Sequence, residues 1–376
     1  MRELSAEDSL RLNVLLANRP LAIRIDESRM AVHALSHEGE MRIELNPNCR
    51  DEQYLRRVRE LLSGHVLGSP GGYPVYLQRW TRMGQMRDES LEELLLLGEP
   101  EAVVAAVCAP GLTDELARRA WWAMEDAGNA RRMLANPSIV EGEMGPVLAA
   151  YLYEHLPFET EVETMVETVR LILQPGLLDE AARNELWKRA ARKNAYYVGF
   201  LLTIPDRIPL DTPAHPRAGE WQPALRDLAD AGNPLAAGLL KLIAPAGQAC
   251  LQCIERALKK PATQDAVTLT LDAVRDHYAV FRPEGNPDLT WDELLVEARD
   301  FVARDAGPAT ALRDIEGIDE LLRGARLLSG VGYGVLRPLL RDTTAIGSLM
   351  RRKIAPFVEP FLEEVGRLRG GYARRP

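Results

Sequence analysis

The sequence predicts a mainly α-helical protein: a HEAT-like helical repeat array preceded by a small α+β domain with a short antiparallel sheet. Three observations indicate this fold class. Alternation of apolar and polar residues with a period of two is confined to residues 1–50. Beyond Tyr76 the apolar residues follow helical spacing, and a segment that begins at Pro110 recurs at Pro175. The predicted domains are 1–87, 88–262 and 263–376.

The composition is that of a folded soluble protein. Of the 376 residues, 46% are hydrophobic and 27% are charged, which excludes a disordered or fibrous chain. The net charge of −9 does not suit a chain that wraps nucleic acid or an anionic membrane along its whole surface. The start of the chain is acidic where a secretory signal is apolar, and the uncharged stretch 242–254 is shorter than the roughly 20 apolar residues that cross a bilayer. With only four cysteines, these features predict a cytoplasmic protein without membrane insertion.

The first 75 residues predict a helix, a three-stranded meander and a second helix. Polar turns of three to five residues separate the strands, and Asn48 or Asp51 is placed to cap the second helix. Glycine and proline predict a loop at 64–74. The expected helices are 7–17 and 52–62, and the expected strands are 21–25, 30–35 and 41–45.

An internal repeat is the strongest signal in the rest of the chain. Aligned without a gap, residues 110–130 and 175–195 are identical at ten of 21 positions, where average composition gives about one or two. In each copy, Pro-Gly ends one helix, an aspartate caps the next, a tryptophan anchors it and an asparagine opens the following helix. These residues are Asp114, Trp122 and Asn129 in the first copy and Asp179, Trp187 and Asn194 in the second.

A shorter echo of the repeat predicts further helix boundaries. Residues 126–129 return as residues 230–233, each with a helix end, a glycine for a left-handed position and an asparagine cap. Stacked helix pairs of this kind form α-solenoids, so the repeat is interpreted as HEAT-like. A Pro-rich surface loop is expected at 205–223, and Gly330–Gly334 is interpreted as a site of close helix packing. Helices are expected at 89–97, 100–107, 265–281, 291–304, 309–328 and 356–369.

Three cysteines are candidate reactive thiols. Cys250 and Cys253 form a C-x-x-C, which fits a redox pair, half of a zinc site or a sulfur-handling pair, because this spacing places both thiols on one helical face. Cys49 precedes a predicted helix start and adjoins Arg50, and both features favour a thiolate. Apolar neighbours and the lack of a second ligand pair favour core packing for the C-x-x-C, and a structural role is also favoured for Cys49. No metal or cofactor site is expected.

A basic and aromatic patch at 53–87 is a candidate nucleic-acid interface. Arginine binds phosphate and aromatic rings stack on unpaired bases, so the mixture fits single-stranded RNA. The favoured alternative is that the aromatic rings face the core and the arginines pair with the acidic run 88–93. The candidate RNA-binding residues are Arg56, Arg57, Arg59, Tyr73, Tyr76, Arg79, Trp80 and Arg82.

Segments of the first two-thirds resemble a known family. The segments from Asn46 to Tyr76, Glu92 to Ala102 and Leu116 to Met124 are similar to the DsrS family, soluble accessory proteins of the dissimilatory sulfite reductase (Dsr) system of sulfur-oxidising bacteria. The resemblance implies a cytoplasmic role that supports oxidation of stored sulfur, including control of the production of Dsr components. It implies no catalytic residues.

The sequence therefore predicts a non-enzymatic scaffold or regulatory protein that binds a protein partner. The repeat builds an extended surface, and no convergent set of catalytic residues is recognised. Two alternatives stay open: an RNA-binding post-transcriptional regulator that uses the 53–87 patch, and a thiol-based sulfur-handling protein that uses Cys250 and Cys253. A small-molecule substrate is not indicated.

Overall fold

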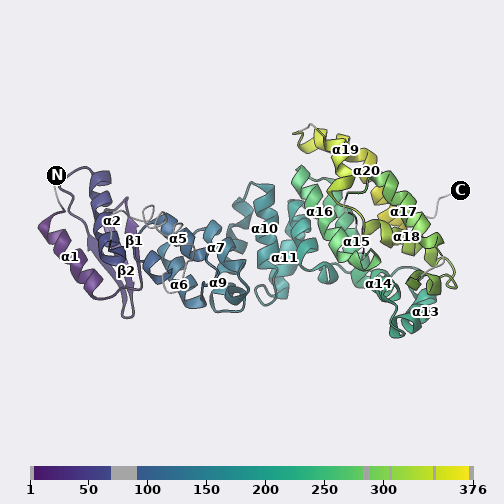
Figure 1. Ribbon diagram of the computed structural model, residues 1–376, viewed down its shortest axis with the longest axis horizontal. Helices are drawn as coiled ribbons and strands as arrows, with labels where there is room; N and C mark the ends of the chain where they lie inside the picture. Colours follow the sequence, from purple (N-terminus) through teal and green to yellow (C-terminus); the bar gives the residue numbers. More distant parts are fainter. Residues whose placement is uncertain are drawn as a thin grey trace. The chain divides into compact units, whose positions relative to one another are not determined.

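The protein is mostly helical, with a small antiparallel sheet near its N-terminus (Figure 1). The computed structural model describes residues 4–68, 91–282, 284, 286, 288–304, 307–341 and 344–371. The chain forms two compact units, Met1–His155 and Leu156–Pro376, hereafter the N-terminal unit and the C-terminal unit.

The predicted meander is confirmed. Three antiparallel strands follow each other in the order β1-β2-β3, with Ile23 opposite Ala34 and Val32 opposite Ile43. Apolar side chains of the sheet and of the two flanking helices form the core of this region. The elements are α1 (Ala6–Ala17), β1 (Ala22–Asp26), β2 (Ala31–Ser36), β3 (Gly39–Glu44) and α2 (Asp51–Leu67).

A buried carboxylate ties the two helices of this region together. Asp8 of α1 is fully buried and accepts hydrogen bonds from the Tyr54 hydroxyl of α2 and from the Asn46 backbone N–H, the latter at 2.7 Å. The predicted cap of α2 is wrong, because Arg50 occupies the N-cap position and forms no side-chain capping bond. The predicted loop also begins too early, since α2 continues to Leu67.

Short helices complete the N-terminal unit, and the segment that follows the first of them packs against β1. The Ile23 backbone N–H donates to the Leu95 carbonyl at 2.8 Å, beyond the end of α4. Gly98 has a φ of +65°, and a Cβ there would lie 2.9 Å from Ile25, so glycine permits this close approach. Of the helix expected at 89–97, residues 89 and 90 lie outside the described residues, and the described part is helical only at Leu91–Leu94. The helices are α4 (Leu91–Leu94), α5 (Pro100–Val107), α6 (Asp114–Ala123), α7 (Ala127–Leu134), α8 (Pro137–Val140) and α9 (Met144–His155).

The described part of the C-terminal unit is helical. The loop expected at 205–223 is shorter than predicted, because α13 begins at Ala218 and contains Pro223. Gly330 does mark close packing, since a Cβ there would lie 2.4 Å from Leu294. The α-helices are α10 (Val162–Ile172), α11 (Glu180–Ala190), α12 (Ala195–Thr203), α13 (Ala218–Asp230), α14 (Pro234–Ile243), α15 (Pro245–Lys259), α16 (Gln264–His277), α17 (Trp291–Ala303), α18 (Ile318–Leu328), α19 (Tyr333–Leu340) and α20 (Gly347–Leu368). Short 3₁₀ helices are η2 (Leu156–Phe158), η3 (Pro205–Arg207), η4 (Ala279–Phe281) and η5 (Gly307–Leu312).

No single helix among the described residues combines the length and the apolar composition of a membrane span. The pair α14 and α15 reaches that length only when joined across a bend of 72°.

The two copies of the repeat both fold as a helix, a turn and a helix, α6–α7 and α11–α12. Their caps differ. Asp179 caps α11 as predicted, accepting from the Ala182 N–H at 2.7 Å. The prediction for Asp114 is wrong: Thr113 caps α6, and Asp114 instead accepts from the Glu143 and Met144 N–H groups.

The tryptophan anchors also differ between the copies. Trp187 is buried and meets the edges of Tyr197 and Phe200, as its predicted role requires. In the first copy the buried ring is Trp121, whereas Trp122 is half-buried, so the predicted anchor there is one residue away.

The asparagines vary in the same way. Asn233 caps α14 by accepting from two N–H groups, and Gly232 before it has a φ of +91°, both as predicted. In contrast, Asp126 caps α7, so Asn129 lies inside the helix and donates to the Met124 carbonyl. The shared sequence thus specifies a helix pair in both units without fixing the same contacts around it.

Candidate functional site

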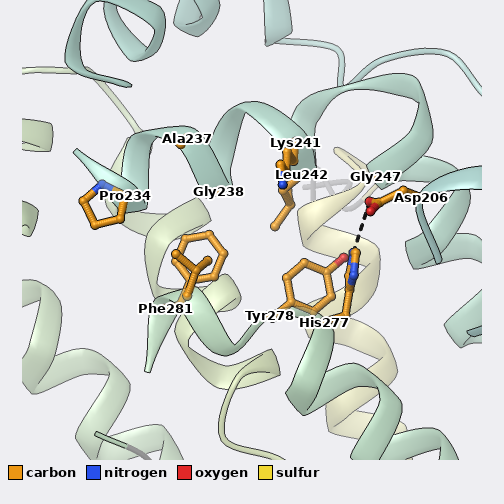
Figure 2. Close-up of a pocket in the computed structure, with 11 residues that line it drawn as sticks. Asp206, Pro234, Ala237, Gly238, Lys241, Leu242, Gly247, His277, Tyr278 and Phe281 are labelled. Atoms are coloured by element: carbon orange, nitrogen blue, oxygen red, sulfur yellow. Dashed lines mark ion pairs between the residues drawn. The ribbon is translucent and has the colours of Figure 1, made fainter. Parts of the chain in front are cut away.

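A cavity of about 270 Å³ in the C-terminal unit is the candidate functional site. It lies among η3, α14, the first turn of α15, the end of α16 and η4 (Figure 2). The Phe281 ring approaches α14 at Gly238, where a Cβ would lie 2.7 Å from the ring, so glycine allows this contact. The remaining apolar wall is supplied by Pro234, Ala237, Leu242, Gly247 and Val280.

Three titratable side chains meet at this cavity. The His277 Nε2 atom lies 3.8 Å from an Asp206 carboxylate oxygen, and Lys241 lines the same space (Figure 2). Burial lowers the pKa of His277, the Asp206 charge opposes this effect, and the Lys241 charge adds to it. Because the net shift is downward from 6.5, His277 is mainly neutral at pH 7. Asp206, with 63% of its side chain exposed, remains open to solvent.

A buried tyrosine connects the cavity to the core. Tyr278 is 3% exposed, and its hydroxyl group faces the buried Cys250 thiol. Burial raises the pKa of Tyr278 well above its ordinary value, and the nearby Cys250 thiol adds to the rise. The hydroxyl group therefore keeps its proton at neutral pH, and Cys250 lies behind the cavity wall.

The C-x-x-C thiols are core side chains. Cys250 and Cys253 on α15 are 1% and 0% exposed, and the Cys253 Sγ donates to the Tyr197 carbonyl at 3.6 Å. Burial raises the pKa of Cys250 to about 12 and raises the pKa of Cys253 well above its ordinary value. Since the thiolate is the reactive form, neither group is prepared for sulfur chemistry at neutral pH.

The other two cysteines lie in the N-terminal unit. Cys49 is half-buried and packs against the core around the sheet, just before the N-cap of α2. Cys108 follows α5 and is exposed, although the sequence interpretation gave it no role.

The described arginines of the basic patch have mixed surroundings. Arg56 pairs with Glu60 at 3.1 Å, and Arg59 pairs with Glu27 from the turn between β1 and β2. Arg57 is half-buried, and its Nη1 atom has no hydrogen-bond partner in the described structure. Within the described residues, Arg56 and Arg59 thus pair with carboxylates other than Glu92 and Glu93, while Asp88 and Glu89 of the predicted acidic run lie outside the described residues. The other candidates, Tyr73, Tyr76, Arg79, Trp80 and Arg82, lie outside the described residues.

No known protein family, characterised protein or solved structure matches this chain. Within the described residues, no three histidine, cysteine or acidic side chains are grouped as metal ligands.

Sequence reasoning missed the cavity because its polar groups are far apart in the chain. Asp206 lies in the predicted loop, Lys241 on an otherwise apolar helix, and His277 at a helix end without a recognisable motif. No spacing rule joins three residues from three elements, so only tertiary packing brings them together.

Proposed function

We propose that this chain is a non-enzymatic, HEAT-like helical scaffold that supports Dsr-type sulfur oxidation by binding a protein of that system. The resemblance of three segments to the DsrS family supports the link to sulfur oxidation. The recurrence of a helix pair in both units supports a scaffold, because successive helix pairs create surface for a partner.

The observation that carries the proposed partner binding is an apolar pair on the outer face of α1. Leu10 and Val14 are 66% and 53% exposed and lie one helical turn apart. The opposite face of the same helix already supplies Leu12, Leu15 and Leu16 to the core. A helix with apolar residues on both faces fits a second packing partner, and adjacent exposed apolar side chains suit a protein surface.

The alternatives have weaker support. Two of the three described arginines in the basic patch already have carboxylate partners, which compete with phosphate. The C-x-x-C thiols are shielded and protonated. A protein partner is therefore the function that these features favour.

The test is recovery of a partner from a sulfur-oxidising bacterium. A tagged chain produced at native level is purified under native conditions, and bound proteins are identified by mass spectrometry. We expect a Dsr component in stoichiometric amount, and its loss in the double variant Leu10→Ser and Val14→Ser. The matched control is Val296→Ser, which changes a valine of similar exposure on α17 and keeps the partner.

Each result has a definite meaning. Recovery of no Dsr component with the unchanged chain contradicts the proposed function. Recovery of a Dsr component by the double variant would show that Leu10 and Val14 of α1 are not the contact surface. Co-purification of RNA, sensitive to salt and to Arg56→Ala, would favour the RNA-binding regulator instead.

A further inference from the structure

We propose that the cavity among η3, α14, α16 and η4 binds a small zwitterion, a free α-amino acid with an apolar side chain. This inference is separate from the scaffold proposal, because the cavity lies in the C-terminal unit and does not involve α1.

The size and the wall of the cavity define the body of the ligand. A volume of about 270 Å³ lies just below the usual range of pockets for drug-sized molecules, so a compact metabolite fits best. The lower wall in Figure 2 consists of the aromatic rings of Phe281 and Tyr278, with α14 opposite Phe281. A branched aliphatic, thioether or phenyl group would bury its surface against these rings.

The charges at the cavity define the polar end of the ligand. Asp206 and Lys241 supply one negative and one positive group from different elements, and both act on His277, so all three lie within short electrostatic range. In Figure 2 Lys241 and Asp206 lie above the two aromatic rings, and Asp206 is joined to His277 beside Tyr278. An ammonium group would pair with Asp206 and a carboxylate with Lys241, while the apolar group enters between the rings.

This arrangement disfavours ligands that have only one charge. A carboxylic acid without an amine leaves Asp206 close to the ligand and without an ammonium partner. An amine without a carboxylate leaves Lys241 close to the ligand and without a carboxylate partner. Neutral His277 adds no charge to those of Asp206 and Lys241. The pair of opposite charges therefore selects a zwitterion over either single-charge analogue.

Calorimetric titration of the full chain tests the proposal. The probes are L-leucine, its deaminated analogue 4-methylpentanoate and its decarboxylated analogue 3-methylbutylamine. We expect saturable binding of leucine and about tenfold weaker binding of each analogue, because each loses one charge-assisted contact. L-Methionine and L-phenylalanine, which keep both charges, are expected to compete with leucine.

Variants at exposed positions separate the site from general effects on folding. Asp206→Asn and Lys241→Met are each expected to weaken leucine binding about tenfold. Matched controls are Asp230→Asn at the end of α13 and Lys259→Met at the end of α15, which are exposed and outside the cavity and keep full binding. Equal binding of 4-methylpentanoate and leucine would overturn the zwitterion assignment. No binding of any of the three amino acids at about 10 mM would overturn the site itself.

Discussion

Removing the charge of Glu297 should destabilise the C-terminal unit more than removing Arg282, one of the two arginines that it contacts. Glu297 of α17 bonds to two buried arginines. Arg326 is 2% exposed and contacts both of its carboxylate oxygens, and Arg282, with a 4% exposed side chain, donates to one of them at 2.5 Å. The remaining carboxylate partner of Arg326 is Glu284, which is 60% exposed.

The magnitude follows from what Glu297→Gln leaves behind. Two neighbouring buried guanidinium groups would share no buried counter-charge, and breaking such a buried pair costs about 3–5 kcal/mol. Because 22% of the Glu297 side chain reaches solvent, we expect about 3 kcal/mol. Arg282→Met leaves a one-to-one pair between Arg326 and Glu297, so we expect only about 1 kcal/mol. Glu284→Gln removes an exposed partner and should cost about 0.5 kcal/mol.

The pH dependence gives an independent check of the cause. Burial raises the pKa of Glu297, but the hydrogen bonds from Arg326 and the charge of Arg282 outweigh it, and the net shift is below 4.5. A lowered pKa means that the carboxylate stabilises the folded state above about pH 4.5 and loses this effect as the pH falls further. The difference between the unchanged chain and Glu297→Gln should therefore shrink below that pH.

Amide hydrogen exchange in α17 and α18 is the suitable assay. A chain with two compact units need not unfold in one transition, so local opening free energies are more informative than one global value. Equal costs for Glu297→Gln and Arg282→Met, or a cost below about 1 kcal/mol for Glu297→Gln, would refute the shared counter-charge argument.

Three further outcomes are expected. Measured by denaturant unfolding, Trp187→Ala should lower the free energy of unfolding by about 3–5 kcal/mol and Trp122→Ala by about 1 kcal/mol, because Trp187 is buried and Trp122 is half-buried. Equal losses would contradict this difference in burial. Asp179→Ala should cost about 1 kcal/mol through loss of the α11 cap, measured by exchange of the α11 amides, and no change there would contradict the capping role. A thiol reagent at pH 7 should modify exposed Cys108 before Cys250 in the folded chain. Burial raises the pKa of Cys250 from 9.0 to about 12, so the protonated thiol stabilises the folded state fully below pH 9. This stabilisation is lost as the pH rises from 9 to 12. A free energy of unfolding that stays constant over this pH range would contradict the prediction.

Local signals in the sequence determined the type of most elements. Period-two alternation identified the meander, and the strands differ from their predicted bounds by only a few residues. The repeat at 110–130 and 175–195 identified a helix pair twice, because proline, glycine and polar caps act within a few residues. Asn233 and Gly232 show the same rule, since a cap and a left-handed glycine need no distant partner.

Contacts between distant residues decided what local signals left open. Thr113 caps α6, while Asp114 accepts from the backbone of a later helix start, 29 residues on. The choice of Trp121 over Trp122 as the buried ring depends on where Tyr151 of α9 packs. The capping residue and the buried ring depend on how each helix is rotated and packed against its neighbours, and the sequence of one segment does not determine this.

The sequence by itself determined a helical chain with a small N-terminal sheet, because hydrophobic period and capping are local properties. Tertiary structure alone buried the C-x-x-C, paired Arg59 with Glu27, and brought Asp206, Lys241 and His277 to one cavity. The physical reason is that burial and electrostatic environment depend on which elements pack together, and that packing joins residues without any fixed separation along the chain.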